Sequence, residues 1–255
     1  MTAHPLAAPE AGPAAALTFH GVGKQFADGT QALDGIDLAV PAGQIVSIVG
    51  PSGCGKSTLL RIVAGLTSAS AGTVQTTGGR LGFVFQDPTL LPWRTVQGNL
   101  ELAGRLDGLG RTERRSRTAA AIALTGLTGF ERHLPRQLSG GMRMRVSLAR
   151  ELTSRPALFL LDEPFGALDE LTRQRLDDEL LRLHAAERFA ALFVTHNVAE
   201  AVYVSHRVLV MSARPGRLVA DVPIPLAHPR TPEDRFAPQF VAATHEVTAR
   251  LQEGS

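Results

Sequence analysis

Short apolar runs recur along the chain, separated by polar or glycine-containing stretches. Strand-like runs lie at residues 16–19, 36–40, 45–49, 81–84, 157–161, 190–194 and 208–211. Those at 45–49, 157–161 and 190–194 are almost continuously apolar, as is typical of strands buried on both faces of a parallel sheet. Polar, glycine or charged residues follow each of these three, where ligands bind in open α/β sheets. The pattern therefore predicts an α/β fold with a mainly parallel sheet.

The strand-like runs stop between residues 87 and 155. Segments compatible with helices take their place, at 95–106, 111–127 and 141–152. We interpret this stretch as a helical insertion in a single domain that spans residues 16–230. Prolines are frequent after Pro215, and a helix is expected at 239–252, within a C-terminal helical tail formed by residues 231–255.

The first 15 residues are rich in alanine and proline and have no lysine or arginine ahead of an apolar run. They are unlike a signal peptide, and we predict a disordered tail. No apolar stretch approaches the ~18 residues that a membrane helix needs. Any membrane role is therefore expected to depend on a partner.

Composition narrows the function only slightly. Among 255 residues, 44% are hydrophobic and 20% charged, and the net charge of +2 gives no electrostatic argument for nucleic-acid binding. Cys54 is the single cysteine, so no internal disulfide can form, and a reducing compartment is expected.

A phosphate-binding loop is predicted directly after the strand at 45–49. Residues 50–58 read Gly-Pro-Ser-Gly-Cys-Gly-Lys-Ser-Thr and fit the pattern Gly-x-x-x-x-Gly-Lys-Ser/Thr, with a helix-compatible segment following. Glycines let backbone N–H groups turn toward phosphates, and the helix adds its positive N-terminal end. Lys56 would contact the β- and γ-phosphates and Ser57 a Mg²⁺ ion. The predicted binding residues are Gly50, Pro51, Ser52, Gly53, Cys54, Gly55, Lys56, Ser57 and Thr58.

Two adjacent carboxylates, Asp162 and Glu163, end the apolar run at 157–161. Neighbouring residues on a strand point to opposite faces, so the two side chains are expected to have different roles. We assign Asp162 to the Mg²⁺ site and Glu163 to the activation of water as general base. The alternative is a strand end with two solvated acids. Cys54 likewise has two interpretations, a small loop residue or a redox-active thiol.

Leu-Ser-Gly-Gly-Met at 138–142 resembles the signature of ATP-binding-cassette (ABC) proteins. Ser139, Gly140 and Gly141 open a helix and offer a hydroxyl and free N–H groups as a second anion site. In the family this site binds the γ-phosphate of an ATP held by the other protomer. An ordinary N-capped helix would have the same local sequence.

Other family motifs follow in order. Gln86 resembles the Q-loop glutamine, which senses Mg²⁺ and the attacking water, and Asp169 lies in a segment that resembles the D-loop. His196 resembles the H-loop histidine, which contacts the γ-phosphate, although a lone histidine is more often structural. Phe26 occupies the place of the aromatic residue that stacks on adenine, with packing as the alternative.

Leu-Leu-Pro-Trp at 90–93 and the turn at 214–217 are similar to importer ATPases for nitrate, aliphatic sulfonates and taurine. Trp93, the only tryptophan, is a candidate permease contact or a core residue. Three positions depart from the family's usual residues: Met144, Glu151 and His206.

The resemblance implies the ABC ATPase fold, a P-loop NTPase-type, mainly parallel sheet with an antiparallel β part near the N-terminus and a helical insertion. It implies ATP and Mg²⁺ as cofactors and a second ATPase copy, expected to form a homodimer. Further expected partners are integral-membrane permease subunits and, through them, a periplasmic or lipid-anchored substrate-binding protein. The chain is accordingly expected at the cytoplasmic face of the cell (inner) membrane.

We therefore predict an energy-coupling, ATP-hydrolysing subunit of an importer for nitrate, sulfonate, taurine or a similar compound. A soluble ABC ATPase acting on nucleic acid or the ribosome is the alternative, but such proteins usually fuse two cassettes or carry long insertions. No nucleic-acid partner is expected. A P-loop kinase would leave the motif at 138–142 and the position of His196 unexplained.

Overall fold

The computed structural model describes residues 15–254. The tail predicted for residues 1–15 lies outside this range except for Ala15, which begins the first strand. The strands are β1 (Ala15–Gln25), β2 (Gln31–Pro41), β3 (Ile45–Val49), β4 (Ala71–Thr76), β5 (Leu81–Val84), β6 (Leu158–Asp162), β7 (Ala190–Val194), β8 (Arg207–Met211) and β9 (Leu218–Pro223). The α-helices are α1 (Lys56–Val63), α2 (Val96–Leu106), α3 (Arg111–Leu124), α4 (Gly140–Leu152), α5 (Glu170–Glu187), α6 (Val198–Val204) and α7 (Pro238–Glu253). Short 3₁₀ turns lie at Pro135–Gln137 and Pro232–Phe236.

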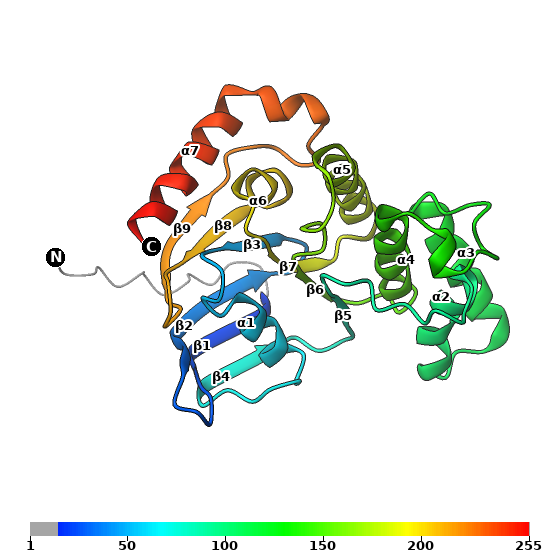
Figure 1. The fold of residues 1–255 in the computed structure, drawn as a ribbon, viewed down its shortest axis with the longest axis horizontal. Coiled ribbons are helices and arrows are strands. Elements are labelled where there is room, and N and C mark those ends of the chain that lie inside the picture. The colour runs from blue at the N-terminus through cyan, green and yellow to red at the C-terminus, as the bar shows by residue number, and fades with distance from the viewer. Residues whose placement is uncertain (1–14, 255) are drawn as a thin grey trace.

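The larger of two sheets has six strands in the order β5-β6-β7-β3-β8-β9 (Figure 1). All neighbours in it are parallel except β8 and β9, which are antiparallel. The predicted parallel core is therefore confirmed. Because β6, β7 and β3 are successive parallel strands, their carboxyl ends meet at one edge of the sheet.

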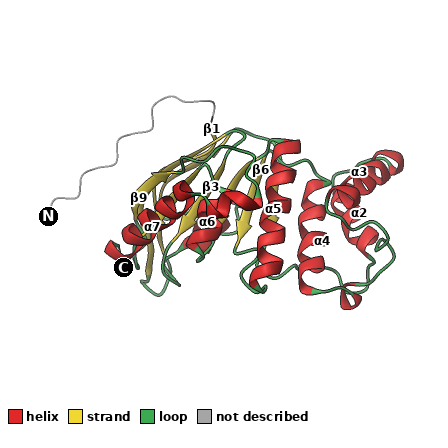
Figure 2. Cartoon of the chain, turned by 90° about the horizontal axis from the view of Figure 1, so that it is seen from above, coloured by secondary structure: helices red, strands yellow, loops and turns green. Residues whose placement is uncertain are grey.

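Strand β3 shows why three runs are continuously apolar. Ile45 and Val49 pack into the core under the helices of one face, whereas Val46 and Ile48 pack into the core on the other face. Every residue of β3 is buried. Helices α5, α6 and α7 cover one face of the sheet, and α1 with the small sheet covers the other (Figures 1 and 2).

The smaller sheet has the order β2-β1-β4, and both of its pairings are antiparallel. This confirms the antiparallel part expected near the N-terminus. The prediction included parts of β1 and β2 but not β4, in which only Val74 is even partly buried. An edge strand with so little apolar surface gives no periodic signal.

Helices α2, α3 and α4 form a group at the β5 end of the large sheet (Figures 1 and 2). They lie within the stretch predicted as a helical insertion, and α4 also packs against α5. Helix α7 packs along β8 and β9 through Ala243 and Val247, so the C-terminal helix is part of the folded body. Within residues 15–254 there is no helix long and apolar enough to span a bilayer.

Candidate active site

The phosphate loop connects β3 to α1, and its glycines are required by its shape. Gly53 and Gly55 have φ angles of 75° and 109°, which disfavour any residue with a side chain. A Cβ on Gly55 would lie 2.9 Å from the carbonyl oxygen of Ala32. The loop therefore runs close against β2 and turns its backbone as a phosphate-binding loop does.

Lys56 is the first residue of α1 and is only 5% exposed. Its Nζ donates to the carbonyl oxygens of Gly50 (2.8 Å) and Pro51 (3.0 Å). The ammonium group is thus held within the turn of the loop itself. It provides a positive charge where the loop N–H groups and the helix N-terminus already favour an anion.

Ser57 and Asp162 come together from elements far apart in sequence. The Ser57 hydroxyl donates to Oδ1 of Asp162 at 2.8 Å. Burial raises the pKa of the Asp162 carboxyl, and the hydrogen bond from Ser57 opposes this effect. A hydroxyl and a carboxylate oxygen are the hard donors that Mg²⁺ prefers, so this pair fits the predicted ion.

Glu163 and His196 form the second polar pair of the site. Oε2 of Glu163 lies 2.8 Å from Nδ1 of His196. The backbone of Glu163 has a φ of 45°, and its N–H donates to the carbonyl oxygen of Val194 at 2.9 Å. The ends of β6 and β7 therefore place a carboxylate and an imidazole beside the phosphate loop.

Lys56, Ser57 and Glu163 line a cavity of about 410 Å³, whereas Asp162 and His196 are not among its lining residues. Phe26 is at its edge and is 42% exposed, with the Nζ of Lys24 5.3 Å from its ring centroid. An exposed aromatic ring in this position is available for stacking on a base. The lining residues are Phe26, Asp28, Thr30, Ala32, Ser52, Gly53, Gly55, Lys56, Ser57, Thr58, Glu163 and Arg214.

Sequence reasoning missed Arg214 as part of the site, and it found Phe26 in the β1–β2 connection but not Asp28 or Thr30. The guanidinium of Arg214 donates to the carbonyl oxygen of Gly53 through Nε (3.1 Å) and Nη2 (2.9 Å). Asp28 accepts the N–H of Thr30, and this hydrogen bond lowers the pKa of Asp28. The turn at 214–217 was noted only as a family resemblance, and nothing local shows that it reaches the loop.

Ser139, Gly140 and Gly141 are not brought to the same cavity. Ser139 caps α4 by accepting the N–H of Met142 at 3.2 Å. Ser139 and Gly141 line a separate cavity of about 230 Å³, which shares no lining residue with that around Lys56. Within one chain, the two predicted anion sites are therefore apart.

Two predicted residues lie between β5 and α2. Gln86 is exposed, and only Phe85 separates it from the end of β5. Trp93 is 73% exposed, which contradicts the core-packing alternative. Asn99 is fully buried, and its Nδ2 donates to the carbonyl oxygens of Leu91, Arg94 and Thr95 at 3.2, 3.1 and 3.0 Å. The loop that carries Trp93 is therefore fixed to α2 by one amide.

Cys54 is 1% exposed, with its Sγ 3.9 Å from Nζ of Lys56. Burial inside the loop favours the interpretation of a small packing residue.

Of the three positions that depart from the family's usual residues, Met144 lies in the core. Glu151 pairs with Arg150 at 3.0 Å, and burial raises its pKa. Nδ1 of His206 accepts the N–H of Ile45 at 3.1 Å.

Comparison with known proteins places the chain in a family. The ABC transporter family matches residues 33–166. An aliphatic sulfonates import ATP-binding protein of Pseudomonas syringae pv. syringae is 48% identical over 232 residues, covering 90% of this chain and 93% of the relative. An uncharacterized ABC transporter ATP-binding protein of Methanocaldococcus jannaschii is 46% identical, covering 88% of this chain and 85% of its own.

Solved structures of ABC cassettes have the same fold as this chain. A dimeric bacterial ABC transporter cassette superposes with a TM-score of 0.71 at 30% identity, covering 83% of this chain and 100% of its own. A post-hydrolysis dimer of the same cassette, bound to ADP and Pi, gives 0.72 at 29% identity. A Clostridium perfringens protein that is part of an ABC transporter complex gives 0.77 at 25% identity, covering 94% of this chain and 96% of its own.

The glycine loop between β3 and α1, with carboxylates at the end of β6 on the far side of β7, defines a P-loop nucleoside triphosphatase. Within that class, the chain belongs to the ABC transporter family and is an ATP-binding, ATP-hydrolysing cassette. None of the relatives described here supports the nucleic-acid alternative.

Proposed function

We propose that the chain is the energy-coupling ATPase of an importer for aliphatic sulfonates or a closely related small anion. The observation that carries the ATPase assignment of individual residues is the 2.8 Å contact between Glu163 and His196, because Glu163 lines the cavity that also holds Lys56 and Ser57. The substrate class is taken from the sulfonate-import relative, to which this chain is 48% identical.

In this proposal Glu163 accepts the proton of the attacking water. Because a carboxylate only accepts hydrogen bonds, Nδ1 of His196 donates to Oε2 of Glu163. The other ring nitrogen, Nε2, takes no part in this hydrogen bond and would face the γ-phosphate. The phosphate loop and Lys56 stabilise the charge that develops on the phosphoryl group.

We assign the metal site to Ser57, Asp162 and Gln86. The Ser57–Asp162 hydrogen bond of 2.8 Å already places two oxygen donors side by side, and Gln86 follows a strand that neighbours β6. When bound, Mg²⁺ would neutralise charge on the β- and γ-phosphates.

We further propose that two copies enclose two ATP molecules, each between the Lys56 loop of one copy and the Ser139 loop of the other. The two separate cavities of one chain support this arrangement. Gln86 and the exposed Trp93 would face integral-membrane permease subunits at the cytoplasmic surface of the inner membrane. A periplasmic or lipid-anchored binding protein would deliver the substrate through the permease.

The test is deletion of the encoding gene and growth with an alkanesulfonate as the sole sulfur source. Loss of growth that the wild-type chain restores, and the Glu163→Gln chain does not, would support the proposal. Full growth of the deletion strain on sulfonates would overturn the substrate assignment. It would not bear on the ATPase assignment, which hydrolysis assays test separately. Purification from membranes in mild detergent should recover a multi-span protein with the chain.

A further inference from the structure

The ring of His196 is held by few contacts of its own. Its side chain is 57% exposed, and among residues 15–254 its only hydrogen bond is the one to Oε2 of Glu163 at 2.8 Å. The connection between β7 and α6 that carries it consists of Thr195, His196 and Asn197. The direction of the ring therefore depends on how this short piece of backbone is fixed.

Thr195, the residue before His196, is anchored through both its backbone and its hydroxyl. It is 2% exposed, and its N–H donates to the carbonyl oxygen of Ile48 in β3 at 3.2 Å. Its Oγ1 accepts the N–H of Asn197 at 3.0 Å, so the hydroxyl bridges the two residues that flank His196. The same hydroxyl donates its own proton to Oε2 of Glu200.

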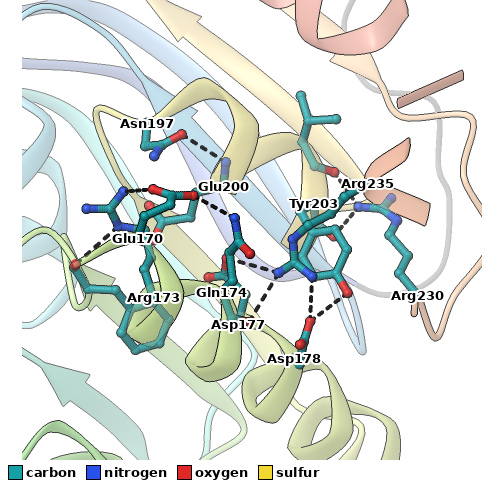
Figure 3. Close-up of polar contacts among 12 residues, drawn as sticks. Glu170, Arg173, Gln174, Asp177, Asp178, Asn197, Glu200, Tyr203, Arg230 and Arg235 are labelled. Atoms are coloured by element: carbon teal, nitrogen blue, oxygen red, sulfur yellow. Dashed lines mark hydrogen bonds and ion pairs between the residues drawn. The ribbon is translucent and has the colours of Figure 1, made fainter. Parts of the chain in front are cut away.

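Asn197 and Glu200 complete a closed set of hydrogen bonds around this connection (Figure 3). Oδ1 of Asn197 accepts the N–H of Glu200 at 3.1 Å and so caps α6. With the two hydrogen bonds of the Thr195 hydroxyl, this makes a closed loop of three hydrogen bonds, which we call the Thr195–Asn197–Glu200 network. Because His196 lies between Thr195 and Asn197, the network fixes its backbone from both sides.

The side chain of Glu200 is not needed for the helix cap itself. Asn197 would hold the first turn of α6 with only the backbone N–H of residue 200. Glu200 is nevertheless a buried carboxyl, 4% exposed, and burying a carboxyl is costly. Its bond to Thr195 is the only hydrogen bond of this side chain among the described residues, because Oε1 has no partner there. The contact with Thr195 is therefore the part of the network that a simple cap does not explain.

The hydrogen bond between Thr195 and Glu200 does not depend on the charge of the carboxyl. Burial raises the pKa of Glu200 to about 7, while the hydrogen bond from Thr195 and the charges of Arg173 and His196 oppose this shift. The charge of Glu163 adds to it. A carboxylate and a carboxylic acid both have an oxygen that accepts a hydroxyl proton, and so does the amide of a glutamine. The geometry of the network can therefore be kept while the charge is removed.

We propose that Glu200 acts through the hydroxyl of Thr195 as a positioning residue for His196 during ATP hydrolysis. The pairing of β6 with β7 brings His196 near Glu163, and the network then directs the ring. Glu200 is not among the residues that line the cavity around Lys56, so it acts only through its neighbours. The inference rests on the proposed role of His196 beside the γ-phosphate.

The test compares variants of Thr195 in steady-state ATP hydrolysis. Thr195→Val removes the hydroxyl and nearly keeps the shape of the side chain, so kcat should fall about 10-fold. KM for ATP should stay within about 3-fold, because the phosphate loop is untouched. Thr195→Ser keeps the hydroxyl and Glu200→Gln keeps an acceptor, so both should retain kcat within about 3-fold of the wild type. Thr125→Val is the matched control, since it removes another buried hydroxyl, which donates to the carbonyl oxygen of Ala121 at 2.8 Å, and it should keep the wild-type kcat.

A double-mutant comparison shows whether the hydroxyl acts on His196. In the His196→Ala background, Thr195→Val should change kcat by less than about 2-fold, because the ring that the network positions is gone. A wild-type kcat in Thr195→Val would overturn the proposal. So would the same ~10-fold loss with and without His196, since the hydroxyl would then act on another part of the site.

A second readout separates the position of the ring from its role in hydrolysis. In NMR spectra of the chain with isotope-labelled histidine, the resonance that disappears in His196→Ala reports this ring. It should shift or broaden in Thr195→Val and stay unchanged in Thr195→Ser, and an unchanged resonance in Thr195→Val would overturn the inference whatever the rate. If His196→Ala hydrolyses ATP at the wild-type rate while the resonance shifts in Thr195→Val, the proposed role of His196 is wrong, whereas the network still positions its ring. Far-UV circular dichroism checks folding, and Thr195→Ala replaces Thr195→Val if the latter does not fold.

Discussion

Glu163 and His196 are 33 residues apart, yet Oε2 of the first lies 2.8 Å from Nδ1 of the second. The pair exists because β6 and β7 are parallel neighbours, with Asp162 opposite Val194 in the register. Glu163 follows β6 directly, and only Thr195 separates His196 from the end of β7. The pairing of β6 with β7 therefore sets the position of the proposed general base relative to the imidazole, and the conformations of more distant loops have little influence on it.

Replacing Glu163 with Gln should reduce ATP turnover by ~10²–10⁴-fold, because the amide cannot accept the proton of water. ATP-dependent dimerisation, followed by gel filtration, should persist. Glu187→Gln, at the exposed end of α5, is the matched control and should retain wild-type turnover. Undiminished hydrolysis by the Glu163→Gln chain would rule out its role as base.

Two inactive variants should restore one another when mixed. Lys56→Ala disables the phosphate loop, and Ser139→Glu places a negative charge in the second anion site. A mixed dimer contains one composite site with both wild-type loops, so roughly a quarter of wild-type turnover should return in an equimolar mixture. If the mixture stays as inactive as its components, the two loops do not meet across a dimer.

Arg214→Ala should weaken ATP binding by about 3–10-fold. The guanidinium makes two hydrogen bonds to the carbonyl oxygen of Gly53, and their loss frees the phosphate loop at its tip. The measurement is the titration of each variant with a fluorescent ATP analogue. Arg111→Ala, on the exposed surface of α3, controls for the loss of one positive charge. Equal affinities would show that the loop needs no such support.

The fluorescence of Trp93, the only tryptophan, should shift to the blue when the permease is added, because 73% of this side chain is exposed in the free chain. Trp93→Ala should weaken permease binding by about 2 kcal/mol or more, roughly 30-fold, and leave the ATP affinity of the isolated chain unchanged. Leu106, 80% exposed on α2, provides the control substitution to Ala. An unshifted emission with full binding of Trp93→Ala would place the permease elsewhere.

Acid should destabilise the fold through a histidine cluster. The rings of His206 and His228 are stacked 3.8 Å apart, and His184 lies 5.5 Å from His206. Burial lowers the pKa of His206 to about 4, with His184 contributing, and burial and Arg230 lower that of His228 to about 3. Both values are below that of an unfolded histidine, so the unfolded chain binds more protons and stability falls as pH drops from about 6.5 toward 4.

His228→Gln should therefore reduce the loss of unfolding free energy between pH 7 and pH 4.5 by about 1–2 kcal/mol, a figure discounted for the partial exposure of the ring. Urea unfolding over this pH range measures it. His20→Gln removes an exposed histidine of β1 and is the control. A wild-type pH dependence in His228→Gln would exclude the cluster as the cause.

The sequence predicted the parts of the fold whose pattern is local. Runs at 45–49 and 190–194 coincide with β3 and β7 because buried strands are uniformly apolar. The run at 81–84 coincides with β5, although Leu81 is exposed. Helix α5 was not predicted. Its buried face includes Asp177, Glu179 and His184, which interrupt the apolar periodicity of a helix. Strand β9 was not predicted, because the prolines in and after it argue against a strand in the sequence pattern. The structure places β9 at the edge of the sheet, where proline is tolerated.

The candidate site also has parts that the sequence predicted and parts that it did not. The loop at 50–58 and the pair Asp162–Glu163 are contiguous motifs, and their side chains lie in or next to one cavity. Arg214 is 161 residues from Gly53 and was not predicted, because a contact of that span depends on strand order. The exposure of Trp93 was equally beyond sequence reasoning, since an apolar residue near a proline can lie inside or outside.

The separation of the Lys56 loop from the Ser139 loop has a consequence for the cell. If each ATP needs both loops, a single copy of the chain holds only half of each active site and hydrolyses no ATP. Turnover then rises with the square of the subunit concentration while dimers are scarce. A permease that brings two copies together would therefore start ATP hydrolysis. Newly made or detached cassettes would hydrolyse no ATP until they are assembled on a transporter.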